Sequence, residues 1–186
     1  MGQPSEHYPV LLLVAVFSRY DAAFEWARTR MEAEWGPVQF TSPRFPFVET
    51  NYYEPTMGPA LDVQFVSFER FISPTALVDI KLATNQWEED YARVGGHPEP
   101  RPLNLDPGYM TAAKLILAST KDHTHRIYLE RGIFAETTLY YKDRAWQSGP
   151  WTFPNYKRAD YQAFFTKCRQ ELRGRAKLER TTEHPE

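Results

Sequence analysis

The chain of 186 residues is short of cysteine, of long apolar runs and of net charge. Its one cysteine, Cys168, excludes an internal disulfide and any metal site made of several cysteines. The longest apolar run, Val10 to Phe17, is far too short to cross a bilayer. It also lacks the basic segment and the small-residue cleavage site of a signal peptide. We therefore expect a cytoplasmic protein with no part in a membrane.

The formal net charge is −2 and the pI is near 6.2. This balance creates no general attraction for nucleic acid or anionic lipid, so neither is expected as a partner. No G-x-x-x-x-G-K-[ST] segment is present, which excludes a P-loop nucleotide site. G-x-S-x-G is absent as well, and no serine has a general base at a recognisable spacing.

Hydrophobic and aromatic residues are plentiful, at 42% and 15% of the chain, and supply a core for one domain. We predict this domain over residues 9–172, between flexible termini at 1–8 and 173–186. Its first half alternates two kinds of segment, with strands predicted at 9–17, 38–47, 61–71 and 102–105 and helices at 21–35 and 73–93. The turn-forming residues Asp106, Pro107 and Gly108 are expected to close the fourth strand.

This succession predicts an α+β fold with a ferredoxin-like βαββαβ core. The expected sheet order is 4-1-3-2, with both helices on one face and the first and third strands as parallel central neighbours. Pro43 and Pro46 place the second strand at an edge. A C-terminal extension should follow: a short helix at 111–120, with a strand as the alternative, then a β-hairpin of 126–129 with 133–141. A closing helix is predicted at 159–172, with Cys168 as a small buried thiol.

Short motifs are spread over most of the chain. The second half contains N-L-D-P-G-Y, T-K-D-H-T-H-R-I-Y-L, G-I-F-A-E-T-T-L and W-T-F-P-N-Y, which begin at residues 104, 120, 132 and 151. The first half contains F-P-F, Y-Y-E and F-V-S-F-E, which begin at residues 45, 52 and 65. In these motifs the chain resembles a bacterial and archaeal family catalogued as domain of unknown function 4416. The resemblance extends from Val10 to about Leu172, and it implies membership without implying a mechanism.

The second half also holds the densest mixture of ionisable side chains within predicted ordered structure. Asp106, His125 and Glu136 could supply the nitrogen and oxygen ligands of a divalent metal, with His123 as a spare ligand. These three residues would then be the catalytic candidates of a metal-dependent hydrolase. In the alternative interpretation, Asp106 caps a turn, His125 bonds a backbone group, and Glu136 pairs with Arg126 across the hairpin.

Lys114, Lys121 and Arg126 could instead hold a phosphate or a carboxylate, with Arg126 as a bidentate partner. Their alternative is a solvated face with ordinary surface ion pairs. A group of aromatic residues could contact a base or a sugar, or could simply seal the edge of the sheet. This group consists of Tyr52, Tyr53, Trp151, Phe153 and Tyr156.

The leading prediction is therefore the binding of a small anionic ligand, a nucleotide or a phosphorylated metabolite, near residues 104–136. Its expected contacts are Lys114, Lys121, Arg126 and Tyr53. Two alternatives stay open, namely the metal-dependent hydrolase with a divalent cation and a protein-interaction module that uses the aromatic loops. The sequence predicts no particular reaction.

Overall fold

The computed structural model describes residues 2–3 and 7–183, apart from the side chains of 176–183. The first half contains β1 (Val10–Ser18), α1 (Asp21–Trp35), β2 (Val38–Thr41), β3 (Phe45–Pro46), α2 (Glu54–Met57), β4 (Asp62–Ile72) and α3 (Leu77–Val94), with the short 3-10 helix η1 (Pro74–Ala76) before α3. The second half contains β5 (Asn104–Met110), β6 (Lys114–Ser119), β7 (Ile127–Glu130), β8 (Ile133–Lys142), β9 (Ala145–Ser148), the 3-10 helix η2 (Pro154–Lys157) and α4 (Ala159–Glu183).

All the strands belong to one sheet, and the predicted α+β class is confirmed. Seven strands follow the order β2-β4-β1-β5-β6-β8-β7, while β3 pairs with β4 and β9 pairs with β8. Every pairing is antiparallel. The sheet order therefore differs from the four-stranded prediction, because β6 pairs with β5 and extends the sheet through β8 to β7 and β9. In the described residues, no helix is long and apolar enough to cross a membrane.

The expectation that β1 and β4 are parallel is wrong. They are neighbours inside the sheet, but they run in opposite directions, with Val14 facing Val66. Helix α1 connects β1 to β2 and returns the chain in its original direction. Strand β2 is therefore parallel to β1, although β4 lies between them. Since β4 pairs antiparallel with both, it must oppose both.

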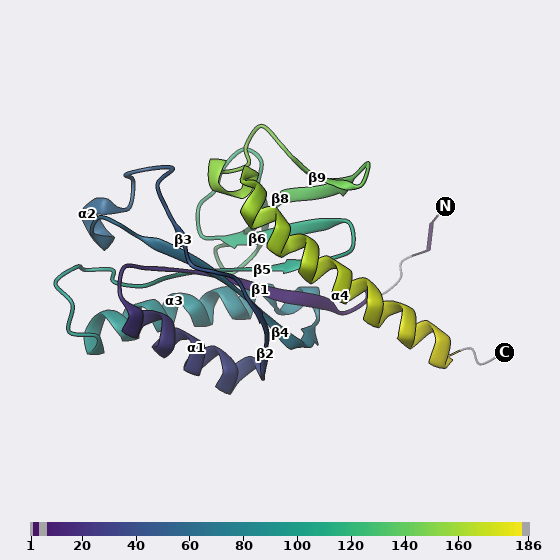
Figure 1. The fold of residues 1–186 in the computed structure, drawn as a ribbon, viewed down its shortest axis with the longest axis horizontal. Coiled ribbons are helices and arrows are strands. Elements are labelled where there is room, and N and C mark those ends of the chain that lie inside the picture. The colour runs from purple at the N-terminus through teal and green to yellow at the C-terminus, as the bar shows by residue number, and fades with distance from the viewer. Residues whose placement is uncertain (1, 4–6, 184–186) are drawn as a thin grey trace.

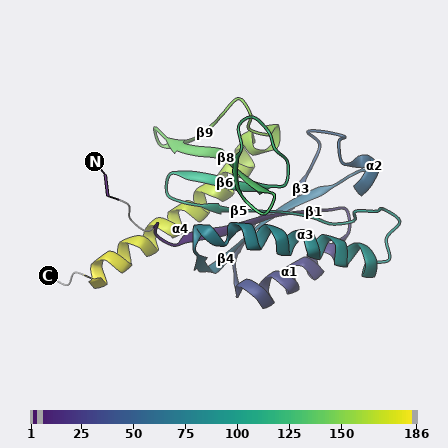
Figure 2. The same cartoon turned by 180° about the vertical axis from the view of Figure 1, so that it is seen from behind.

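The apolar run of β1 packs against helices on both faces of the sheet (Figures 1 and 2). Leu12, Val14 and Val16 share a cluster with buried residues of α1 and α3, such as Phe24 and Trp87. The alternate residues of β1 belong to a second cluster, together with the buried residues of α4. Side chains of a strand point to opposite faces in turn, so a strand covered on both faces is apolar throughout. The prediction of a central buried strand is thus confirmed.

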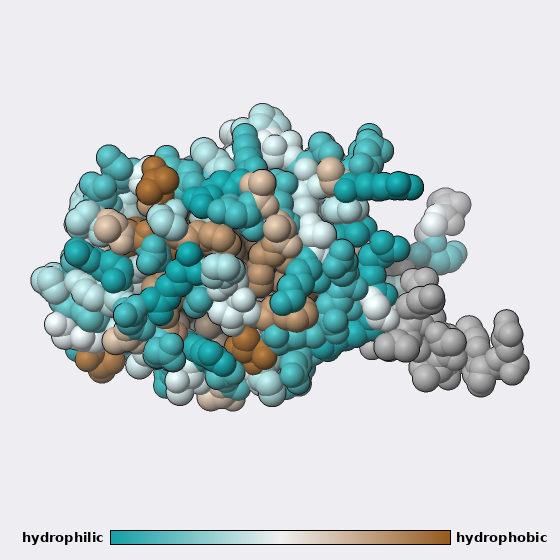
Figure 3. Space-filling view, in the orientation of Figure 1, coloured by the Kyte–Doolittle hydropathy of each residue, from teal (hydrophilic) through white to brown (hydrophobic). Residues whose placement is uncertain are grey.

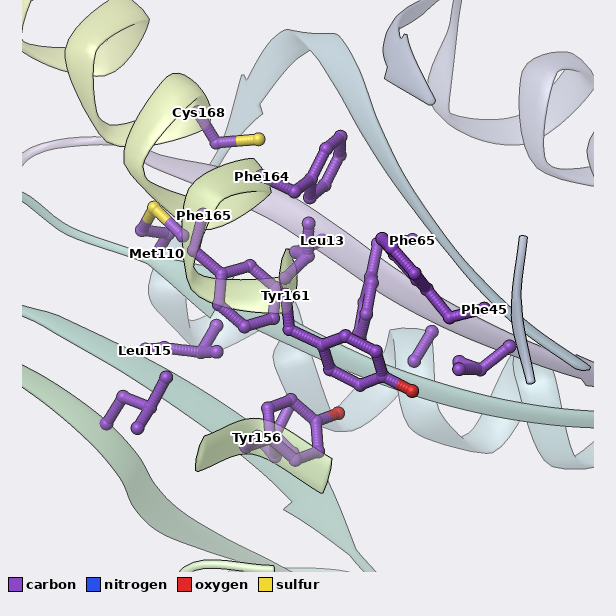
Figure 4. Close-up of a cluster of buried hydrophobic side chains, with 14 of the residues drawn as sticks. Leu13, Phe45, Phe65, Met110, Leu115, Tyr156, Tyr161, Phe164, Phe165 and Cys168 are labelled. Carbon is purple, nitrogen blue, oxygen red and sulfur yellow. The ribbon is translucent and has the colours of Figure 1, made fainter. Parts of the chain in front are cut away.

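An aromatic core joins α4 to the sheet (Figure 4). The ring of Phe65 on β4 lies 4.8 Å from that of Tyr161 and 4.9 Å from that of Phe165, both nearly edge to face.

Burial raises the pKa of the Cys168 thiol to about 12, so this residue is an unreactive core thiol, as predicted. Hydrophobic surface continues along one side of α4, while most of this view is hydrophilic (Figure 3).

Several predicted boundaries agree with the structure. Helix α1 spans the predicted residues, β2 and β3 occupy an edge, and the Ser73 side chain accepts a hydrogen bond from the Thr75 amide before α3. The hairpin of β7 and β8 is also present. Residues 114–119 form a strand instead of the preferred helix, and α4 continues past its predicted end at Leu172. Residues 1, 4–6 and 184–186, which belong to the predicted flexible termini, lie outside the described residues.

The predicted turn at 106–108 is wrong, because these residues lie inside β5. Strand β5 pairs with β1 along its whole length, but with β6 only from Gly108 to Met110. The Leu105 amide and carbonyl point away from β1, toward the side of β6, and Pro107 two residues later has the same orientation. Proline has no N–H to donate, so pairing with β6 stops there. The sheet divides at Pro107.

Gly108 allows the backbones of β5 and β6 to approach closely next to the point where the two strands separate. A Cβ atom at this position would collide with the Ile116 carbonyl of β6 and lie 2.7 Å from the Leu117 side chain. We expect Gly108→Ala to lower the free energy of unfolding by about 2 kcal/mol or more, because backbone must move to make room. Chemical denaturation measures this loss. Gly174→Ala in α4, where nothing lies within 4 Å, is the control and should stabilise the protein by roughly 0.5–1 kcal/mol. Equal effects of the two substitutions would contradict the proposed packing.

Candidate functional site

A cavity of about 640 Å³ lies where β5 and β6 separate. Its lining residues come from β1, α3, β5, β6, β8 and η2, and from the segments before α2, before β5, between β6 and β7, and before η2. The polar lining residues include Lys81, Asn85, Arg101, Asn104, Asp106, Ser119, Lys121, His123, Arg126 and Glu136. The aromatic ones are Phe17, Phe47, Tyr52, Tyr53, Phe153 and Tyr156. Apolar walls with a few converging polar groups are typical of small-molecule sites.

Where β5 has no neighbouring strand on the side of β6, two side chains of α3 form hydrogen bonds with its backbone. The Leu105 amide donates to Glu88 Oε1 at 2.8 Å, and its carbonyl accepts from Lys81 Nζ at 2.9 Å. Both side chains are buried. Burial raises the pKa of the Glu88 carboxyl above its ordinary value, against the opposing effect of the positive charges of Lys81 and Arg101. Thus α3 satisfies the backbone groups that the opening of the sheet leaves unpaired.

Lys81 is also part of a polar network at the cavity wall. Lys81 Nζ lies 3.3 Å from Asp106 Oδ1, and Asn104 Nδ2 donates to Asp106 Oδ2 at 2.9 Å. Arg101 donates to the Asn104 side chain and to Glu88 Oε2, the latter at 2.8 Å from Nη2. The Asp106 side chain remains 30% exposed. This carboxylate is therefore held in place and still reaches the cavity.

A second network stands on the wall formed by β6 and β8. Arg126 Nε donates to Glu136 Oε2 at 2.7 Å, and Arg126 Nη1 donates to Ser119 Oγ at 2.6 Å and to the Lys121 carbonyl at 3.0 Å. The exposed fractions of the Arg126 and Glu136 side chains are only 4% and 1%. His125 Nε2 lies 3.0 Å from the same Glu136 oxygen. Of the alternative interpretation, the pairing of Glu136 with Arg126 is confirmed, whereas His125 contacts Glu136 instead of a backbone group and Asp106 lies within β5 instead of capping a turn.

His125 faces Glu136 and aromatic neighbours, and it does not line the cavity. Its ring lies almost parallel to those of His123 and Trp151, with centroids 5.9 and 5.7 Å away. In the described part of the chain, no three His, Cys, Asp or Glu side chains are grouped so that they could hold a metal ion. Asp106 and Glu136 line one cavity, but Lys81 and Arg126 engage them, so the proposed ligand triad with His125 is not assembled.

The mouth of the cavity has an aromatic side. Lys121 Nζ lies 3.2 Å from the Tyr52 hydroxyl and 4.7 Å from the centre of its ring. Burial raises the pKa of Tyr53 to about 12, so its hydroxyl is protonated at neutral pH and can donate a hydrogen bond. Burial also raises the pKa of Tyr156, and the charges of Asp106 and Glu136 add to the effect. Tyr156 is thus near both polar networks.

The model of the family described as "Domain of unknown function (DUF4416)" matches residues 8–172. The chain belongs to this family. The match covers β1 to β9 and α4 as far as Leu172, so both cavity networks lie within the family domain. Comparison with curated proteins and with solved structures gives no significant match.

The cavity of this DUF4416 domain contains some of the predicted contacts and omits others. Lys121, Arg126 and Tyr53 line it, whereas Lys114 lies at the far end of β6. Sequence reasoning missed a set of polar residues on α3, just before β5 and at the first residue of β5, namely Lys81, Asn85, Glu88, Arg101 and Asn104. The positions of Lys81 and Glu88 could have been noticed in the sequence. They lie seven residues apart on the face of the predicted helix that packs against the sheet, where charged residues are uncommon.

The buried Arg126–Glu136 pair gives a stability test that also addresses the metal hypothesis. We expect Glu136→Gln to lower the free energy of unfolding by about 3 kcal/mol, because it leaves the Arg126 charge buried with a neutral partner. Glu130→Gln on the same hairpin is the control, since Glu130 pairs with Arg131 at the exposed surface and should cost at most about 1 kcal/mol. Thermal unfolding with and without a chelator measures both. A wild-type protein that loses stability with the chelator, beside an unaffected Glu136→Gln variant, would instead indicate a metal.

Proposed function

We propose that the cavity between β5 and β6 binds a small anionic ligand, a nucleotide or a phosphorylated metabolite. Its volume of about 640 Å³ lies within the range of roughly 300–1,000 Å³ that is common for small-molecule sites. It also combines aromatic walls with fixed polar groups. Such a combination supports ligand binding more than it supports a purely structural void, which would be smaller and apolar.

The proposal rests on how the positive charges that line the cavity are paired with carboxylates. Four cationic side chains line the cavity, and three of them have carboxylate partners: Lys81 has Asp106, Arg101 has Glu88, and Arg126 has Glu136. The Lys121 side chain has no carboxylate partner in the described part of the chain, and its Nζ atom lies beside the Tyr52 hydroxyl and ring. One positive charge at the mouth is therefore uncompensated, and it favours an anion in the cavity.

Arg126 supports the proposal through its fixed position. Its Nε and Nη1 atoms have protein acceptors, while Nη2 makes no hydrogen bond to any described residue. A guanidinium whose geometry is already set loses little freedom when it binds a phosphate or carboxylate oxygen. The exposed rings of Tyr52 and Phe153 at the mouth suit a planar base or a sugar face.

In the same proposal, we interpret the succession β5-β1-β4-β2, with α1 and α3 on one face, as a ferredoxin-like core to which β6 to β9 are added. The order of these four strands and the two helix crossovers support this interpretation. The added strands then provide the second wall of the cavity. The protein would act in the cytoplasm, where nucleotides and phosphorylated metabolites are abundant.

Lys121→Ala tests the charge argument. We expect this variant to bind AMP about tenfold more weakly, because a charge-assisted contact with phosphate contributes roughly 1.5 kcal/mol. Arg126→Lys should also weaken binding, since lysine keeps the charge but loses the fixed planar donors. Isothermal titration calorimetry on variants with unchanged circular dichroism gives the affinities.

Lys114→Ala is the matched control for this experiment. It removes the same charge close to the other end of β6, and Lys114 does not line the cavity. Its AMP affinity should stay within about twofold of wild type, the difference expected from a screened surface charge. Equal losses in Lys114→Ala and Lys121→Ala would mean that only overall charge matters. Wild-type protein that binds no phosphate compound would reject the proposed function.

A further inference from the structure

We infer that the ligand is a phosphate ester of a hydroxylated sugar, whose hydroxyl groups donate to Asp106 while its phosphate lies at Lys121 and Arg126. This inference rests on the proposed function and names the ligand class. It follows from the polar wall that Asp106 and Asn85 form, because the binding of an anion does not explain the role of these two residues. The shared chemistry is a sugar phosphate, either free or as part of a nucleotide.

The Asp106 carboxylate has acceptor capacity to spare. Oδ1 accepts from Lys81 Nζ at 3.3 Å and Oδ2 accepts from Asn104 Nδ2 at 2.9 Å. A carboxylate offers about four lone-pair sites, so roughly two remain for groups in the cavity. Because its side chain is held from two sides and is 30% exposed, the free acceptor positions are fixed in space. A pair of ligand donors can use them without reorganisation of the protein.

The charge around Asp106 selects neutral donors. The Lys81 ammonium is buried beside the carboxylate and already balances its charge. A second ammonium or guanidinium from a ligand would be repelled by Lys81 at short range in a partly buried site. A hydroxyl group donates a hydrogen bond without adding charge, so it suits this position. The wall therefore favours alcohols over amines.

Asn85 adds a donor and an acceptor on the same wall. It follows Lys81 by four residues on α3, so both side chains lie on one face of the helix. Asn85 lines the cavity, and its side-chain amide makes no hydrogen bond to a described residue. An amide that can both donate and accept matches a hydroxyl group, which does the same. Two residues thus present unused polar groups to one part of the cavity.

The two polar walls belong to a single cavity. Asp106 and Asn85 come from β5 and α3, whereas Lys121 and Arg126 come from the segment that follows β6. Tyr156 lines the same cavity as both Asp106 and Glu136. A ligand that satisfies both walls needs an anionic end and a neutral hydroxylated end in one molecule. Inorganic phosphate has only the first.

The experiment compares three probes by calorimetry: methyl phosphate, ribose 5-phosphate and AMP. In wild-type protein, ribose 5-phosphate should bind at least about tenfold more tightly than methyl phosphate, the equivalent of one or two hydrogen bonds to a charged acceptor. Asp106→Asn should abolish this difference without lowering the affinity for methyl phosphate, because the variant loses the acceptor for the sugar hydroxyls and leaves the Lys81 charge in the cavity unbalanced. Tighter binding of AMP than of ribose 5-phosphate would indicate a nucleotide, and the reverse would indicate a free sugar phosphate.

Two further variants keep the test decisive. Asp122→Asn is the charge-matched control, because Asp122 follows Lys121 but does not line the cavity, and it should retain the preference for ribose 5-phosphate. Asn85→Ala should reduce that preference, and it applies even where Asp106→Asn does not fold. Equal binding of methyl phosphate and ribose 5-phosphate to wild type would overturn the inference and leave the proposed function standing. Binding of neither would reject both.

Discussion

The proline in the middle of the sheet determines where this protein has a cavity. Pro107 belongs to a strand with neighbours on both sides, and it cannot donate the hydrogen bond that β6 would need. The strands stay paired on one side of it, through Gly108, and diverge on the other. An interior strand therefore gains a free edge without leaving the sheet. The adjoining space contains the polar residues of both candidate networks.

A free edge inside a protein requires other partners for its backbone groups, because unpaired buried amides and carbonyls are costly. Here Glu88 and Lys81 supply them from α3. Their charges then require partners of their own, and Arg101 and Asp106 provide these. The polar wall of the cavity is thus a consequence of the divided sheet. The proposed ligand site and the stability of the sheet depend on the same side chains, so substitutions there should be judged by ligand affinity and by unfolding together.

The sequence predicted best where one local pattern decides the structure. The unbroken apolar run of β1 and the Ser73-Pro74 helix start both correspond to what is observed. Prediction failed at 106–108, because three strong turn residues lie in a strand whose pairing with β1 outweighs their local preference. Lys81 and Glu88 were visible on a predicted helix face, but their role depends on the Leu105 backbone and on a sheet opening that no local pattern encodes.

The candidate site is fixed more by paired charges than by free ones. Arg126 is nearly inaccessible and neutralised by Glu136, and Lys81 is similarly balanced by Asp106. Buried pairs of this kind contribute little net stability compared with apolar side chains of similar volume, so stability alone does not account for them. Both pairs have a member that lines the cavity and has hydrogen-bonding capacity left over, Arg126 at Nη2 and Asp106 at its carboxylate. In the proposed function, rigid groups with balanced charge would distinguish ligands by geometry, while the unbalanced Lys121 would attract an anion.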